Sequence, residues 1–166
     1  MVSPELIRRY PFFAGLSHDH VDTLAQLAEE VTVEPDHVFF REDESLDRFY
    51  LLVEGAVAVF LAVPDPARRQ PVSGQLTGRL ETADVIVSTV GPGEVFGWSG
   101  LVPPPVASAG AKAVARSRVL AFDTGRLSDI FDADCQLAYR ITQKAASVLR
   151  ERLRDMRIES LSQQQE

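Results

Sequence analysis

The residues best suited to chemistry are three small ones near the middle of the chain. Gly97, Ser99 and Gly100 follow the apolar pair Val95-Phe96. Glycines in a loop that enters a short helix allow close approach to the backbone, and the first N–H groups of a helix have no internal acceptor. The helix dipole adds positive potential there, so these residues predict a cradle for an anion. Ser99 can cap the helix or donate its hydroxyl.

Other reactive side chains lack partners at useful spacings. His18 and His20 have no cysteine or paired carboxylate at metal-ligand spacing, so we expect both at the surface and no metal site. A single cysteine, Cys135, excludes an internal disulfide, fits a reducing compartment and predicts a packed helix residue. No paired nucleophile and base can be named, so we expect no catalytic residues, no cofactor and no enzymatic activity.

Composition limits the class of protein. The chain has 166 residues, 45% of them hydrophobic, which is enough for one sizeable core. No apolar run approaches the ~20 residues that a bilayer requires, and the N-terminus lacks a signal peptide, so we expect a cytoplasmic protein without membrane contact. A net charge of -7 argues against a duplex-binding surface over the whole molecule, although basic residues gather between Arg140 and Arg157. Those residues predict a solvated helix face or a contact with an acidic partner or nucleic acid.

Periodicity divides the chain into three stretches. Apolar residues from Ser3 to Glu30 recur at helical spacing, Pro11 splits this stretch, and a second helix is expected over Ser17–Glu30 with Ser17 as its N-cap. From Val31 to Asp123 the period becomes two, which predicts an antiparallel sandwich or barrel. The expected strands are Val31–Val33, Val38–Phe40, Arg48–Glu54, Ala56–Ala62, Val85–Val90, Ser108–Ala113 and Arg118–Asp123. Between them, Val63–Thr82 is rich in Pro and Gly and predicts a long, mobile hairpin loop.

The third stretch is helical, with a short helix over Arg126–Phe131 and a long one over Asp134–Leu161. The long segment contains no Gly or Pro and carries two neighbouring apolar stripes. One is a narrow seam of the coiled-coil type, and its residues are Ala146, Leu149, Leu153 and Met156. The other, which could pack on the barrel, consists of Leu137, Ile141, Ala145 and Val148. The seam is expected either to pack within the chain or to form a parallel homodimer, and we favour the homodimer.

Four segments in this order resemble the cyclic-nucleotide-binding domain of the Crp/Fnr regulators and of kinase regulatory subunits. They are Pro11–Ser17 (PFFAGLS), Phe39–Tyr50 (FFREDESLDRFY), Leu51–Val59 (LLVEGAVAV) and Val90–Gly97 (VGPGEVFG). The resemblance covers nearly all of Leu6–Arg157. It implies a mainly β fold, a double-stranded β-helix (jelly roll) barrel with short N-terminal helices and a long C-terminal helix. Asp36 and Asp43 replace two glycines of the family's turns, and aspartate tolerates such geometry better than most residues.

The last segment leads into the family's phosphate-binding cassette, which is non-canonical here. In nucleotide-binding relatives, a glutamate after the Phe-Gly pair accepts from the ribose 2′-hydroxyl, and an arginine downstream pairs with the cyclic phosphate. The glutamate position is Trp98, and the arginine falls on Ala107 or Val106. Lys112 lies nearby but belongs to the next strand, where we expect it to face outward. We therefore expect no binding of cAMP or cGMP in the usual mode.

Three interpretations of this pocket stay open: Trp98 only fills the mouth of the barrel, the pocket binds a different small-molecule effector, or it binds a cyclic nucleotide after all. The candidate ligand-binding residues are Phe96, Gly97, Trp98, Ser99, Gly100, Leu101, Val106, Ala107 and Ser108.

We expect residues 1–133 to form the cyclic-nucleotide-binding-like domain and residues 134–166 to form the dimerisation helix and tail. The leading hypothesis is a stand-alone regulatory module in which a ligand or partner repositions the helices. The alternative is the sensor half of a Crp/Fnr-type transcription regulator that binds a cyclic nucleotide or another small effector. The chain reaches Glu166 directly after the long helix, so we expect no DNA-binding module in it.

Overall fold

The structure is a computed structural model that describes residues 1–65 and 82–163. The chain forms two compact units. One is Glu29–Thr124, and the other joins Met1–Ala28 to the chain from Gly125 onward. The boundary expected between residues 133 and 134 stays a prediction.

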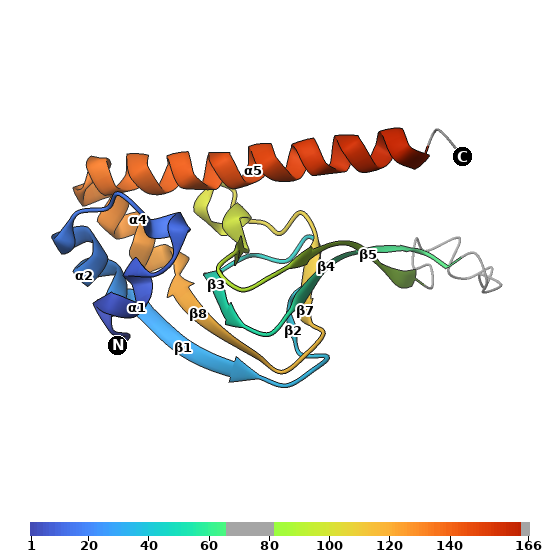
Figure 1. Cartoon of the computed structure of the whole chain (residues 1–166), viewed down its shortest axis with the longest axis horizontal. Coiled ribbons are helices and arrows are strands. Elements are labelled where there is room, and N and C mark those ends of the chain that lie inside the picture. The colour runs from blue at the N-terminus through green and yellow to red at the C-terminus, as the bar shows by residue number, and fades with distance from the viewer. Residues whose placement is uncertain (66–81, 164–166) are drawn as a thin grey trace. The chain divides into compact units, whose positions relative to one another are not determined.

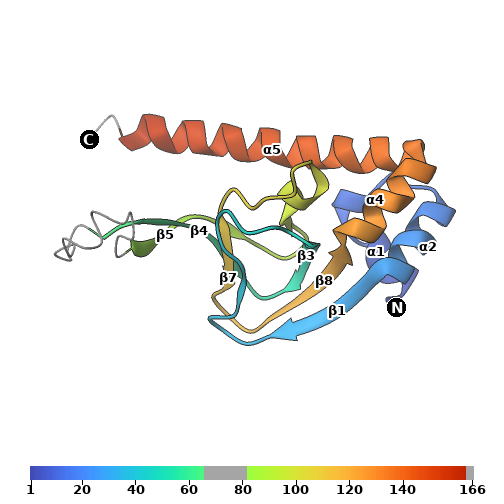
Figure 2. The same cartoon turned by 180° about the vertical axis from the view of Figure 1, so that it is seen from behind.

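The Glu29–Thr124 unit is built from two four-stranded sheets, ordered β1-β8-β3-β6 and β2-β7-β4-β5. Figures 1 and 2 show their strands from opposite sides. The strands are β1 (Ala28–Val33), β2 (Val38–Phe40), β3 (Arg48–Glu54), β4 (Val57–Pro64), β5 (Thr82–Val90), β6 (Val95–Phe96), β7 (Gly110–Ala113) and β8 (Ser117–Asp123). The antiparallel pairing of these sheets confirms the mainly β, jelly-roll fold.

The core of this unit draws side chains from both sheets, as the period of two requires. Its fully packed members are Tyr50, Leu52, Val57, Val90, Phe96, Ala111, Val119 and Ala121. Because β3, β6 and β8 supply one half and β4, β5 and β7 the other, the core lies between the sheets.

The other unit is helical. Its elements are α1 (Pro4–Arg8), the 3-10 helix η1 (Pro11–Phe13), α2 (His18–Leu27), α4 (Thr124–Ala133), whose first residue belongs to the β unit, and α5 (Cys135–Gln163). Prolines open α1 and η1, where the missing N–H costs no helical hydrogen bond. The predicted cap of α2 is confirmed, because Ser17 Oγ accepts a 3.2 Å hydrogen bond from the His20 N–H.

Several elements differ from expectation, and the clearest cases are α2 and β6. The helix predicted to reach Glu30 ends at Leu27, and Ala28 begins β1. Glu29 and Glu30 instead bind arginines of the same sheet, at 3.1 Å from Arg48 of β3 and 2.7 Å from Arg118 of β8. Strand pairing here overrides local helix propensity. The second difference is β6, whose two residues are too short to give a periodic signal.

The predicted loop over Val63–Thr82 was wrong at its ends. Val63 and Pro64 belong to β4 and pair with Ala83 and Thr82 of β5. Residues 66–81 lie outside the described part of the chain. Lys112 faces outward as expected, with its ammonium 3.4 Å from the Asp84 carboxylate and over the Phe60 ring.

The long helix follows its predicted limits closely, since Asp134–Leu161 was expected and α5 covers Cys135–Gln163. Cys135 is exposed, so the prediction that it packs was wrong. No helix among residues 1–65 and 82–163 has the length and apolar character needed to cross a bilayer.

Candidate functional site

The cassette is held in place by the turn that precedes it. Glu94 Oε2 accepts a 2.5 Å hydrogen bond from the Gly91 N–H. The Gly93 N–H donates to the Leu52 carbonyl at 2.7 Å, and the Leu52 N–H donates to the Glu94 carbonyl at 2.9 Å. These bonds fix the lead-in to β6 against β3.

Gly97 occupies a position that only glycine fits well. Its φ of 71° is left-handed, and it caps the 3-10 helix η2 (Trp98–Leu101). A Cβ there would lie 3.2 Å from the Arg48 carbonyl oxygen and 3.3 Å from the rings of Phe40 and Tyr50. The backbone therefore approaches β3 as closely as the sequence predicts.

Gly100 brings η2 against two residues that the sequence did not single out. A Cβ on Gly100 would lie 2.9 Å from Thr124 Cγ2 and 3.2 Å from Leu46 Cβ. The Thr124 hydroxyl donates to the Leu46 carbonyl at 3.2 Å, and both residues are buried. Neither residue belongs to a ligand-binding motif, so the sequence alone gave no reason to choose them. Only the fold places them beside the cassette.

Phe96 lies in the core. It is 1% exposed and stacks on Tyr50 with ring centroids 4.9 Å apart and an interplanar angle of 10°. Phe39 contacts both rings, at 5.0 Å from Phe96 and 5.2 Å from Tyr50. Burial raises the pKa of the Tyr50 hydroxyl. Tyr50 of this aromatic cluster packs against Gly97, and the cluster leaves Phe96 little surface for a ligand.

The segment at the expected arginine position is fastened to the loop before β3. The Ala107 N–H donates to the Glu44 carbonyl at 2.8 Å, and the Asp43 N–H donates to the Ala107 carbonyl at 2.9 Å. The Leu46 N–H donates to the Pro105 carbonyl at 2.7 Å. Leu46 therefore contacts both halves of the predicted site: η2 through Gly100, and the segment that leads to Ala107 through Pro105.

Exposure differs among the candidate residues. Ala107 is 1% exposed, whereas Val106 is 38% exposed. Trp98, Ser99, Gly100 and Leu101 are half-buried, and Ser108 is exposed. The structure thus brings the backbone of the predicted site together but leaves Trp98 as its largest side chain able to meet a ligand.

The charge around the site disfavours an anion. No basic side chain lies within Phe96–Ser108, and the backbone partners of Ala107 are the acidic residues Asp43 and Glu44. The Glu44 carboxylate is held in this loop by a 2.9 Å hydrogen bond from the Arg41 N–H. The negative charge of these two acidic residues, close in the chain to the backbone that meets Ala107, weakens the attraction of a phosphate for the backbone N–H groups.

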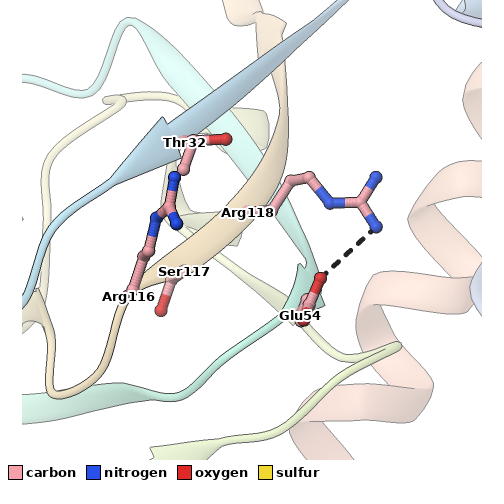
Figure 3. A pocket seen from close by; sticks show the side chains of 5 residues that line it. All are labelled: Thr32, Glu54, Arg116, Ser117 and Arg118. Atoms are coloured by element: carbon pink, nitrogen blue, oxygen red, sulfur yellow. Dashed lines mark ion pairs between the residues drawn. The ribbon is translucent and has the colours of Figure 1, made fainter.

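A separate open cavity of about 320 Å³ lies in the β unit, and Figure 3 shows the side chains that line it. It is lined by Thr32, Glu54, Arg116, Ser117 and Arg118. None of these belongs to the predicted site.

The two guanidinium groups of this cavity have carboxylate partners. Arg116 lies 3.4 Å from Glu34, and Arg118 lies 2.7 Å from Glu30 and 3.5 Å from Glu54. The hydrogen bond that Arg118 donates to the Glu30 carboxylate raises the pKa of Arg118. The ion pairs of Arg118 link β8 to β1 and β3, and the pair of Arg116 links the turn before β8 to the residue after β1.

The predicted seam lies on the more exposed half of α5. Leu153 is 49% and Met156 61% exposed, Ala146 is exposed and Leu149 is half-buried. Within the second stripe, three residues are buried: Leu137, Ile141 and Ala145. The first half of α5 contacts η1, and Lys144 Nζ donates to the Pro11 carbonyl at 3.4 Å.

The two histidines near the N-terminus differ in exposure, although both were expected at the surface. His18 is exposed as predicted, with 69% of its side chain accessible, but only 12% of the His20 side chain is accessible. The prediction that His20 is a surface residue was therefore wrong. Among residues 1–65 and 82–163, no three His, Cys, Asp or Glu side chains gather where they could hold a metal ion.

Comparisons with known proteins agree with this architecture. Residues 30–134 match the Cyclic nucleotide-binding domain family. A Rhodopseudomonas palustris protein, described provisionally as a potassium channel protein, is 26% identical over 143 residues, which are 86% of this chain but 30% of that protein.

Two solved structures share the fold over most of the chain. One, from Geobacter metallireducens, is described provisionally as a cyclic nucleotide-binding protein; it is 28% identical, with a TM-score of 0.74 over 92% of this chain and 99% of that one. The other is the N-terminal domain of a Streptomyces coelicolor transcriptional regulator, 25% identical, with a TM-score of 0.63 over 91% of this chain and 94% of that one. The chain therefore belongs to the Cyclic nucleotide-binding domain family.

Proposed function

We propose that this chain is a regulatory module whose pocket has kept the backbone of the phosphate-binding cassette and lost its nucleotide-recognising side chains. The observation that carries the proposal is a combination of backbone and side chains. Gly97 has the left-handed conformation, whereas Trp98 stands at the expected glutamate position and Ala107, at the expected arginine position, is buried. The ligand of such a site is a small effector other than a cyclic nucleotide bound in the usual mode.

The size of the lost interactions supports this. A hydrogen bond to a charged group contributes about 1.5–3 kcal/mol. Without the glutamate and the arginine, binding weakens by roughly 3–6 kcal/mol, which corresponds to about two to four decades of affinity. The indole of Trp98 also occupies space that a ribose would need.

Regulation would pass through Thr124. This residue is the first of α4, it contacts Gly100 and Leu46, and its N–H donates to the Asp47 carbonyl at 2.9 Å. A ligand that shifts η2 would therefore displace the start of α4 and change how α5 exposes its apolar seam to a partner. The proposal assigns the chain no catalytic reaction.

The partner we propose for α5 is a second copy of the chain. Ala146, Leu149, Leu153 and Met156 form a narrow apolar stripe, half-buried at Leu149 and exposed at the other three, whose 3-4-3 spacing is that of a two-stranded coiled coil. Residues 134–166 would then act as the dimerisation element. Occupancy of the cassette would alter the angle at which the two seams meet.

A second candidate is the sensor half of a transcription regulator. It is favoured by the 25% identical Streptomyces coelicolor domain, which covers 91% of this chain. The match to 30% of a larger Rhodopseudomonas palustris protein equally suits a module within a longer chain. The mass of the natural protein, measured by immunoblotting, separates a module of this size from a larger regulator.

Hydrogen exchange tests the relay through Thr124. Gly100→Ala should press on Thr124 and raise amide exchange in α4. Ser99→Ala, one residue away, adds no atom to η2 and should leave exchange in α4 unchanged. Exchange in β4 and β7 monitors the integrity of the fold. Unchanged α4 exchange in Gly100→Ala, with the fold intact, would exclude this relay.

A further inference from the structure

His20 is a part-buried histidine whose ring has one hydrogen-bonded nitrogen and, within the described residues, one nitrogen without a partner. Its Nε2 lies 3.0 Å from Asp134 Oδ2, and its side chain is 12% exposed. Its Nδ1 is fully buried and has no hydrogen-bond partner among the described residues. Because buried polar atoms are nearly always paired, such an arrangement calls for a structural explanation.

Asp134 is the junction between two helices. Its N–H donates to the Ile130 carbonyl of α4 at 2.7 Å. Its Oδ1 accepts from the Gln136 and Leu137 N–H groups of α5 at 3.1 and 3.0 Å, which makes it the N-cap of α5. Its other oxygen, Oδ2, is the one that meets His20. One carboxylate therefore caps α5 and binds α2 at the same time.

The chemistry of the pair fixes the direction of the hydrogen bond. An ionised carboxylate only accepts, so His20 Nε2 must carry the proton. The Leu137 N–H and the His20 bond both lower the pKa of Asp134, which keeps this carboxylate in its accepting form. With Nε2 as the donor, Nδ1 carries a lone pair and no proton, so this buried atom leaves no N–H donor unsatisfied.

We propose that His20 is a positioning residue that latches α2 to the N-cap of α5 and so sets where the long helix begins and which way it leaves the α4–α5 junction. The role rests on the proposed function of α5 as the element that is repositioned. With the latch closed, α2 and the first turn of α5 move as one body. The seam residues Leu153 and Met156 lie further along the same helix, so their presentation depends on that anchor.

Two variants separate the latch from the cap. Asp134→Asn keeps a good N-cap, since asparagine and aspartate cap helices about equally well, but it replaces the carboxylate that accepts from His20. His20→Ala removes the donor and leaves the cap intact. His18→Ala, at the exposed neighbouring histidine, is the matched control.

The first measurement is the nitrogen NMR spectrum of His20 in the ligand-free protein. We expect a persistent proton on Nε2, a signature that packing alone would not impose. A proton confined to Nδ1, or rapid exchange of one proton between the two nitrogens, would overturn the proposal.

The second measurement is amide exchange at Gln136 and Leu137. His20→Ala and Asp134→Asn should each raise it about three- to tenfold, and the double variant should rise no further, because both remove the same interaction. His18→Ala should change nothing. Additive effects would show that the residues act independently and would refute the latch. Neither measurement uses an effector, so failure of the latch and failure of the relay through Thr124 are distinguishable.

Discussion

Single residues with unusual backbone geometry shape the loops around the cassette. Asp36 and Asp43 have φ values of 67° and 64°, the left-handed conformation that favours glycine. From this conformation, the Asp43 N–H reaches the Ala107 carbonyl at 2.9 Å. A strained turn thus fastens the segment that would otherwise carry the phosphate-binding arginine.

Substitutions at Asp43 test the cost of this geometry. Asp43→Ala should lower the free energy of unfolding by about 1–2 kcal/mol, because alanine lacks the polar side chain that helps aspartate tolerate positive φ. Asp43→Gly should stay close to wild type. Urea unfolding at neutral pH measures both. Equal stability of the two variants would show that φ at this position carries no strain.

At this scale, part of the site could be predicted from sequence. The glycine at 97 and the aspartates at 36 and 43 follow from turn chemistry, which is local. The burial of His20 and the exposure of Cys135 could not, because both depend on how helices distant in sequence pack. The contacts of Leu46 and Thr124 with Gly100 are equally non-local.

Among the elements, α5 carries most of the functional argument. Its first half buries Leu137, Ile141 and Ala145, whereas its second half exposes Leu153, Met156, Ile158 and Leu161. The periodicity predicted both stripes. The shortened α2 and the two-residue β6 escaped prediction because strand pairing decides them, and pairing is absent from a local pattern.

The proposed dimer seam on α5 can be tested through the oligomeric state of the protein. Leu153→Asp with Met156→Asp should convert a dimer into a monomer, because both replace apolar contacts with like charges across the interface. Ile158→Asp is the matched control, since Ile158 is as exposed but lies off the seam. Light scattering gives the masses. A wild type that is already monomeric, or a dimer that survives the double substitution, would contradict the proposed interface.

The cap of α5 predicts a dependence of stability on pH. The Leu137 N–H, with help from His20, lowers the pKa of Asp134 in the folded state. A lowered pKa contributes stability above the unfolded value of about 3.9 and loses it as the pH falls through the folded value. Urea midpoints should therefore drop more steeply for wild type than for Asp134→Asn between about pH 4 and pH 2. Parallel curves would show that the carboxylate gains nothing from its partners.

On the scale of the whole molecule, the fold was the most predictable feature and the ligand the least. Four motifs in order led to a jelly roll with flanking helices, and the family match over residues 30–134 agrees. The net charge is -7 and the cassette segment Phe96–Ser108 carries no basic residue, and these two facts underlie the proposal that the ligand is not a cyclic nucleotide bound in the usual mode. The effector that we propose for the pocket cannot be read from a motif, because its fit against Trp98 would depend on shape.

The measurement that tests the central claim most directly is calorimetric titration with cAMP and cGMP up to millimolar concentration. It compares wild type with the double variant Trp98→Glu/Ala107→Arg, with Ser99→Ala as a control for cassette folding. We expect no binding to wild type and measurable binding to the double variant, because the backbone cradle is intact and only the side chains are missing. Tight binding of either nucleotide to wild type would contradict the account and make this an ordinary nucleotide sensor with a rebuilt pocket.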